Sequence, residues 1–176
     1  MKLALFSDNV SEKHVVKLKS FFTKPLREVK FLYITTATNY KPYQPDWSVE
    51  SESRWREIFP LLRQFDLERA YKVDPNFDFK TYFESFDFIF VSGGNVFLLS
   101  YWMNKTGADK ILKELILSNK IVYGGESAGA IYPYNDMSLY AELDNPEKAP
   151  KRIDQAMGLL ILHLYHTGKA KIFTQD

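Results

Sequence analysis

Stretches with the apolar pattern of a β-strand alternate along this chain with stretches in which apolar residues recur at helical spacing. Short runs of apolar or β-branched residues predict strands at Leu3–Phe6, Phe31–Thr35, Ala70–Val73, Phe86–Val91 and Ile121–Tyr123. Several of these runs are apolar on both faces, which is typical of strands buried in a parallel sheet. Apolar residues at helical spacing predict helices over 15–22, 55–65, 96–102 and 111–116, and Thr106–Asp109 fits a capping box that opens the last one.

This alternation predicts an α/β fold: a mostly parallel sheet with helices on both faces, in a single domain over residues 1–176. Ligands of such sheets bind in the crevice outside the carboxyl ends of the strands. The turns expected at that edge are Thr35–Tyr40, Ser92–Asn95 and Gly124–Ala130. Two of the three are rich in glycine, so we look for chemistry there.

Composition narrows the classes of function. The chain has 176 residues, 45% of them hydrophobic, which is enough for one sizeable core. Its 23 Lys and Arg residues nearly balance 22 Asp and Glu, so charge gives no reason to expect a nucleic-acid or membrane partner. The absence of cysteine excludes disulfides, thiolate metal sites and a cysteine nucleophile. No apolar run approaches the roughly 18 residues of a membrane span, and the first strand is too short for a signal peptide, so we expect a cytoplasmic protein.

The residues Gly125-Glu126-Ser127-Ala128-Gly129 match the pattern G-x-S-x-G. They follow a predicted strand and precede a predicted helix, the context in which this pattern forms a nucleophile elbow. A serine held in a strained backbone conformation needs neighbours without bulk, and the N–H of Ala128 would then face a developing oxyanion. A structural strand-to-helix turn that uses glycine for tight geometry explains the same residues, and both interpretations remain open here.

A second strand, Phe86–Val91, also runs into a glycine turn, Ser92-Gly93-Gly94-Asn95. If the two strands are neighbours, the N–H of Gly94 lies close to Ser127 and supplies a second oxyanion donor. An ordinary tight turn in which Asn95 caps the next helix is the alternative, and the two roles are compatible. We predict that Asn95 and Glu126 contact the substrate.

Val91–Leu99 and Gly124–Ala130, with Lys105–Asp109 between them, resemble the peptidase E (dipeptidase E, S51) family of serine peptidases. The resemblance covers most of the chain and implies a class I glutamine-amidotransferase-like fold, that is, a flavodoxin-like arrangement of three layers. It implies that Ser127 is the nucleophile and that Gly94 and Ala128 donate to the oxyanion. It also implies cleavage of dipeptides with N-terminal Asp, without a metal or an organic cofactor.

The base and its orienting carboxylate are harder to assign. The first helix carries His14, which chain order places on the far side of the fold, leaving His163 and His166. The family has a Pro-His-aromatic segment here, and His166 falls within one residue of its place, although this chain lacks the proline. By the same resemblance Asp144 is the preferred third member and Asp136 the second choice.

The last residues depart from the family, whose members continue past their histidine. We expect a short C-terminal part that leaves a sheet edge open, and with it reduced activity or a homodimer.

Three functions are therefore considered. The first is a serine dipeptidase acting through Ser127, His166 and Asp144. A catalytically impaired relative that binds or regulates is the alternative, and a general esterase or amidotransferase-like hydrolase comes last. Residues 39–47, rich in aromatic residues and proline, are interpreted as a packing loop rather than a cover over the substrate.

Overall fold

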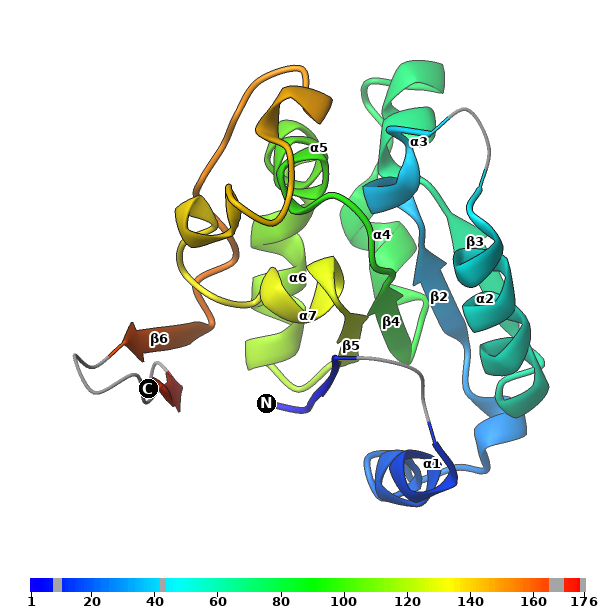
Figure 1. Ribbon diagram of the computed structural model, residues 1–176. Helices are drawn as coiled ribbons and strands as arrows, with labels where there is room; N and C mark the ends of the chain where they lie inside the picture. Colours follow the sequence, from blue (N-terminus) through cyan, green and yellow to red (C-terminus); the bar gives the residue numbers. More distant parts are fainter. Residues whose placement is uncertain (8–10, 42–43, 165–169, 175–176) are drawn as a thin grey trace.

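The computed structural model describes residues 1–7, 11–41, 44–164 and 170–174. Its centre is a five-stranded sheet in the order β1-β5-β4-β2-β3, in which all neighbours are parallel (Figure 1). The strands are β1 (Leu3–Phe6), β2 (Phe31–Ile34), β3 (Leu62–Phe65), β4 (Phe88–Val91) and β5 (Val122–Glu126). The predicted parallel α/β sheet is confirmed. A separate antiparallel pair consists of β6 (Leu160–Leu164) and β7 (Ala170–Thr174).

Helices cover both faces of the sheet (Figure 1). They are α1 (Glu12–Lys19), α2 (Asp46–Ile58), α3 (Leu67–Val73), α4 (Phe79–Glu84), α5 (Val96–Thr106), α6 (Ala108–Leu117) and α7 (Ala128–Ile131). Short 3₁₀ turns lie at Leu26–Glu28, Thr36–Thr38, Ser138–Tyr140 and Pro146–Lys148. None of the helices in the described part of the chain is both long and apolar enough to cross a bilayer.

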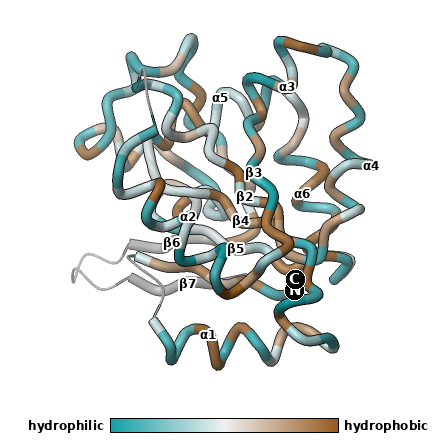
Figure 2. The backbone as a smooth tube through the Cα atoms, turned by 90° about the vertical axis from the view of Figure 1, so that its right-hand side faces the viewer, coloured by the Kyte–Doolittle hydropathy of each residue, from teal (hydrophilic) through white to brown (hydrophobic). Residues whose placement is uncertain are grey.

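Alternate residues of the central strands feed two hydrophobic clusters. On one face Phe31, Phe88 and Phe90 pack with Trp55 of α2 and Leu18 of α1. On the other face, leucine, isoleucine and valine side chains of the same strands pack against α3 to α7. The hydrophobic stretches of the chain accordingly gather at the sheet (Figure 2). Side chains alternate across a strand, so a run that is apolar throughout serves both layers.

Two predicted elements are wrong. Residues 70–73 belong to helix α3 and not to a strand, because the Asp66 side chain accepts a hydrogen bond from the Arg69 N–H and starts a helix there. The helix predicted over 55–65 stops at Ile58, and residues 62–65 form strand β3 instead. Pro60 explains the break, since proline disfavours helical backbone at the residue before it, and Phe59 has φ −124° and ψ 83°.

The capping box predicted at Thr106 does not form either. Gly107, with φ 72°, is the joint between α5 and α6, and the Thr106 hydroxyl donates to the Trp102 carbonyl oxygen at 2.7 Å. The glycine ends one helix in a left-handed conformation and the next begins at once.

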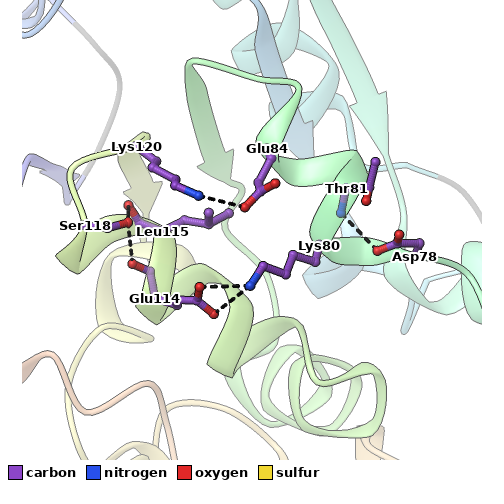
Figure 3. Close-up of polar contacts among 8 residues, drawn as sticks. All are labelled: Asp78, Lys80, Thr81, Glu84, Glu114, Leu115, Ser118 and Lys120. Carbon is purple, nitrogen blue, oxygen red and sulfur yellow. Dashed lines mark hydrogen bonds and ion pairs between the residues drawn. The ribbon is translucent and has the colours of Figure 1, made fainter.

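Ion pairs join α4 to the end of α6 at the surface (Figure 3). The Lys80 Nζ lies 2.9 Å from Glu114 Oε1, and the Lys120 Nζ lies 3.0 Å from Glu84 Oε1. Exposed pairs of this kind contribute little to stability, so the contact between α4 and α6 depends on the apolar residues beneath them.

Candidate active site

Ser127 occupies a strained turn between β5 and α7. Its φ of 48° and ψ of −113° lie in a region that side chains with a Cβ rarely adopt. The surrounding backbone holds it there: the Ser127 N–H donates to the Phe6 carbonyl at 3.1 Å, and its own carbonyl accepts from Ala130 and Ile131 at 2.9 Å. The unusual conformation predicted for this serine is confirmed.

The glycines around Ser127 allow three backbones to touch. A Cβ added to Gly125 would lie 2.2 Å from the Gly129 carbonyl oxygen, and one added to Gly129 would lie 2.0 Å from that of Val91. The Tyr123 hydroxyl donates to the same Gly129 oxygen at 2.8 Å. The small residues of the motif therefore let α7 approach the ends of β4 and β5 closely enough to form the turn.

The second glycine turn lies beside the first, as predicted. Strands β4 and β5 are paired, and a Cβ added to Gly93 would lie 3.2 Å from the Ser127 Cβ. Gly94 has φ 138°, and its added Cβ would meet the Ala37 carbonyl oxygen at 2.3 Å. Ala128 is the first residue of α7, so its N–H belongs to the first turn, whose amides have no acceptor within the helix. Both predicted oxyanion donors thus lie at the same edge of the sheet as Ser127.

A cavity of about 360 Å³ opens over this edge. Its lining comes from four chain segments and consists of Ser7, Tyr40, Trp47, Ser51, Gly93, Gly94, Glu126 and Ser127. Both Tyr40 and Trp47 belong to the segment interpreted as a packing loop. Since they line the cavity, these two residues form part of a wall of the candidate site.

Glu126 is buried, although a turn glutamate could equally have been exposed. The Ser51 Oγ lies 3.0 Å and 2.9 Å from its two carboxylate oxygens, and the Tyr33 hydroxyl donates to Oε1 at 3.2 Å. Burial, and next the Glu126 carboxylate, raise the pKa of Tyr33 far above its ordinary value, which keeps the phenol protonated as a donor. These partners could not be predicted from the sequence, because they lie 75 and 93 residues from Glu126.

Asn95 and Asp144 tie the glycine turn to a distant loop. Asn95 Oδ1 accepts from the Leu98 N–H at 2.9 Å, which confirms the predicted helix cap, and its Nδ2 donates to the Asn145 carbonyl at 3.0 Å. Asp144 Oδ2 accepts from the Val96 N–H at 2.8 Å, and burial raises the pKa of this carboxyl. Asp144 therefore lies at the start of α5, at the edge that carries the site.

Asp136, the second choice for this role, is held differently. Its Oδ1 accepts from the Ser138 N–H at 2.8 Å, and its backbone bridges to Gln155.

The choice of histidine as the base remains a prediction, but the expected position of His14 is corrected. His166 lies outside the described residues, and His163 belongs to β6. His14 does not lie far from the site: its ring packs edge-on against Phe6 at 5.3 Å, one residue before Ser7 of the cavity. Its Nδ1 accepts from the Ser11 N–H at 3.1 Å, which fixes the start of α1. Among the residues that the structure describes, no group of three or more His, Asp or Glu side chains could hold a metal ion.

The sequence matches the model of peptidase family S51 over residues 4–168. It is 44% identical to the uncharacterized peptidase Lin0382 of Listeria innocua over 63 residues, 36% of this chain and 30% of that protein. It is 32% identical to the uncharacterized peptidase Lmo0363 of Listeria monocytogenes over 139 residues, 79% of this chain and 65% of that protein. The match thus spans less than two thirds of each relative.

The fold also resembles a solved structure. A crystal structure from Listeria monocytogenes EGD-e that is assigned to peptidase E superposes with a TM-score of 0.74 at 26% identity, covering 89% of this chain and 74% of that one.

Proposed function

Since this chain belongs to peptidase family S51, we propose that it is a serine peptidase of small peptides with Ser127 as its nucleophile. The observation that carries the proposal is the strained backbone of Ser127 at a strand-to-helix turn in the wall of a cavity. A strain that the surrounding hydrogen bonds must maintain is characteristic of functional positions.

The chemistry follows from this placement. The Ser127 Oγ attacks the peptide carbonyl carbon, and a histidine, for which we propose His166, takes the hydroxyl proton. The N–H groups of Gly94 and Ala128 donate to the oxygen that becomes negative. The C–N bond then breaks as the histidine returns the proton to the leaving amine, and water hydrolyses the acyl-enzyme.

Supporting groups complete the proposal. We propose that Asp144 orients the histidine. If so, Asp144→Asn should reduce kcat by about 10² or more, while Asp136→Asn stays active. The reverse result would transfer the role to Asp136.

Glu126 binds the substrate. Asn95, which follows Gly94 and caps α5, is the second proposed substrate contact. Peptides that begin with Asp are the first proposed substrates, and the cavity of about 360 Å³ suits small peptides.

Labelling with a fluorophosphonate tests the nucleophile. We expect the wild-type protein to be labelled at Ser127 and Ser127→Ala to lose both labelling and hydrolysis of Asp-Ala. The control is Ser20→Ala, which removes an exposed serine that does not line the cavity and should keep both. Labelling that persists in Ser127→Ala would refute the assignment. Peptide binding without any labelling or turnover would support a binding module instead.

We further propose that the chain forms a homodimer. Among the described strands, none pairs with the outer edge of β1, and open strand edges associate. Sedimentation equilibrium at micromolar concentration should give twice the chain mass of 20.6 kDa; a monomer at all concentrations would contradict this proposal.

A further inference from the structure

The cavity beside Ser127 combines a carboxylate with aromatic walls. Glu126 contributes the acid, and Tyr40 and Trp47 contribute the rings. The Trp47 ring lies 3.5 Å from where a Cβ on Gly93 would be, so it flanks the glycine turn next to the serine. None of the described residues that line the cavity is Lys, Arg or His.

Neutral donors hold the Glu126 carboxylate in place. The Ser51 hydroxyl reaches both oxygens and the Tyr33 hydroxyl reaches one, at 2.9 to 3.2 Å. Hydrogen bonds to a carboxylate favour its ionised form without adding positive charge. One helix and one strand therefore fix the orientation of this carboxylate, since Ser51 belongs to α2 and Tyr33 to β2.

A carboxylate beside aromatic faces is the chemistry that recognises an ammonium group. Opposite charges attract strongly in a partly desolvated cavity, and a cation over an indole or phenol ring gains further stabilisation. A second carboxylate in the same place would be repelled. The part of the cavity beside Glu126 therefore suits an ammonium group rather than an acidic side chain.

We propose that Glu126, Tyr40 and Trp47 form a subsite for a primary ammonium group of the substrate. This inference rests on the proposed function, because it places the ammonium next to the carbonyl that Ser127 attacks. Two groups of a peptide have this chemistry: the free α-amino group, two bonds from the carbonyl carbon, and the side chain of an N-terminal lysine. In an Asp-initiated peptide, the α-amino group occupies the subsite and the aspartate side chain lies outside it.

Binding to the Ser127→Ala protein tests the subsite without requiring turnover. Calorimetry would compare Leu-Ala with N-acetyl-Leu-Ala, which differ in the α-ammonium, and Lys-Ala with norleucyl-Ala, which differ in the side-chain ammonium. We expect the ammonium of at least one pair to tighten binding about tenfold or more. The first pair identifies the α-amine as occupant and the second identifies the lysine side chain.

The added substitution Glu126→Gln should bring that ratio close to one, because glutamine keeps the shape of the side chain and removes its charge. Glu57→Gln, an exposed glutamate on α2, is the matched control and should leave the ratio unchanged. Trp47→Leu should lower the ratio in part and serves if Glu126→Gln fails to fold. Ratios near one for both pairs, or a ratio that Glu126→Gln and Trp47→Leu leave intact, would overturn the subsite. Labelling at Ser127 would still stand in that case, so the two proposals fail separately.

Discussion

At the scale of single residues, the candidate site depends on one strained backbone. Ser127 carries a Cβ at φ 48° and ψ −113°, where glycine is the residue without steric cost. Hydrogen bonds to β1 and from α7 keep it there. Glycine would adopt this backbone conformation without strain, so the serine side chain at this turn costs stability.

Replacing Ser127 by glycine should therefore stabilise the fold. We expect Ser127→Gly to exceed Ser127→Ala by about 1 kcal/mol in the free energy of unfolding, because alanine keeps the strained Cβ and glycine removes it. Both variants should be inactive. Urea denaturation monitored by circular dichroism measures the difference, and a glycine variant less stable than the alanine variant would show that the turn is not strained.

The glycines of the motif give a second prediction at this scale. Gly129 has no positive φ, but its added Cβ would lie 2.0 Å from the Val91 carbonyl oxygen, whereas Gly107 has φ 72° and open space around it. We expect Gly129→Ala to lower stability by about 2–3 kcal/mol through overpacking and Gly107→Ala by about 1 kcal/mol through conformation alone. Equal losses in urea denaturation would contradict the close approach of α7 to β4.

These residue-scale features were predictable because they are local. G-x-S-x-G between an apolar run and a helix contains the strand, the turn and the serine within a few positions. The burial of Glu126 was not predictable, since its partners Ser51 and Tyr33 come together only through the order of strands and the packing of α2.

At the scale of elements, α5 connects the glycine turn to the loop that carries Asp144. Asn95 caps this helix and Asp144 accepts from the Val96 N–H, so two acceptors serve its first turn. Element prediction succeeded for α5 because its apolar pattern is long, and it failed for residues 70–73 and 62–65. Those short apolar runs fit a strand or a helix equally, and the deciding features were the Asp66 cap and Pro60.

The carboxyl of Asp144 should make stability depend on pH. Burial raises its pKa above the ordinary 3.8, so the folded chain binds this proton more tightly than the unfolded chain. Its contribution is therefore fully present below pH 3.8 and is lost as pH rises through the folded pKa. Asp144→Asn keeps an oxygen acceptor for Val96 and does not titrate.

The difference in unfolding free energy between Asp144→Asn and wild type should consequently grow in favour of the variant as pH rises from 3 to 7. Denaturation midpoints over this range measure it, with Asp136→Asn as the control in the same stretch of chain. A difference that shrinks with rising pH would mean that the Val96 hydrogen bond to the ionised carboxylate outweighs burial.

At the scale of the whole molecule, one sheet separates two hydrophobic clusters of different composition. The cluster against α1 and α2 is aromatic, with Phe31 stacked on Phe88 at a centroid distance of 4.6 Å. The cluster against α3 to α7 is mainly aliphatic. The sequence predicted a sheet covered on both faces, because several of its strands are apolar on both faces. It did not predict the strand order, in which β5 inserts between β1 and β4, because that order depends on contacts between distant segments.

Because both clusters share the central strands, they should unfold together. Phe31→Ala removes a buried ring from one face and Leu115→Ala a buried side chain from the other, and we expect losses of about 3–5 and about 2–5 kcal/mol. Each variant should show one transition whose midpoint is the same by far-ultraviolet circular dichroism and by tryptophan fluorescence. Trp55 lies in the first cluster and Trp102 in the second, while the third tryptophan, Trp47, belongs to neither. In a Trp47→Phe background, adding Trp102→Phe leaves Trp55 as the reporter of the first cluster, and adding Trp55→Phe leaves Trp102 as the reporter of the second. Different midpoints for the two faces would show that the sheet does not couple their unfolding. The candidate site takes Glu126 from one face and α7 from the other, so it would then lose its geometry before the whole fold is lost.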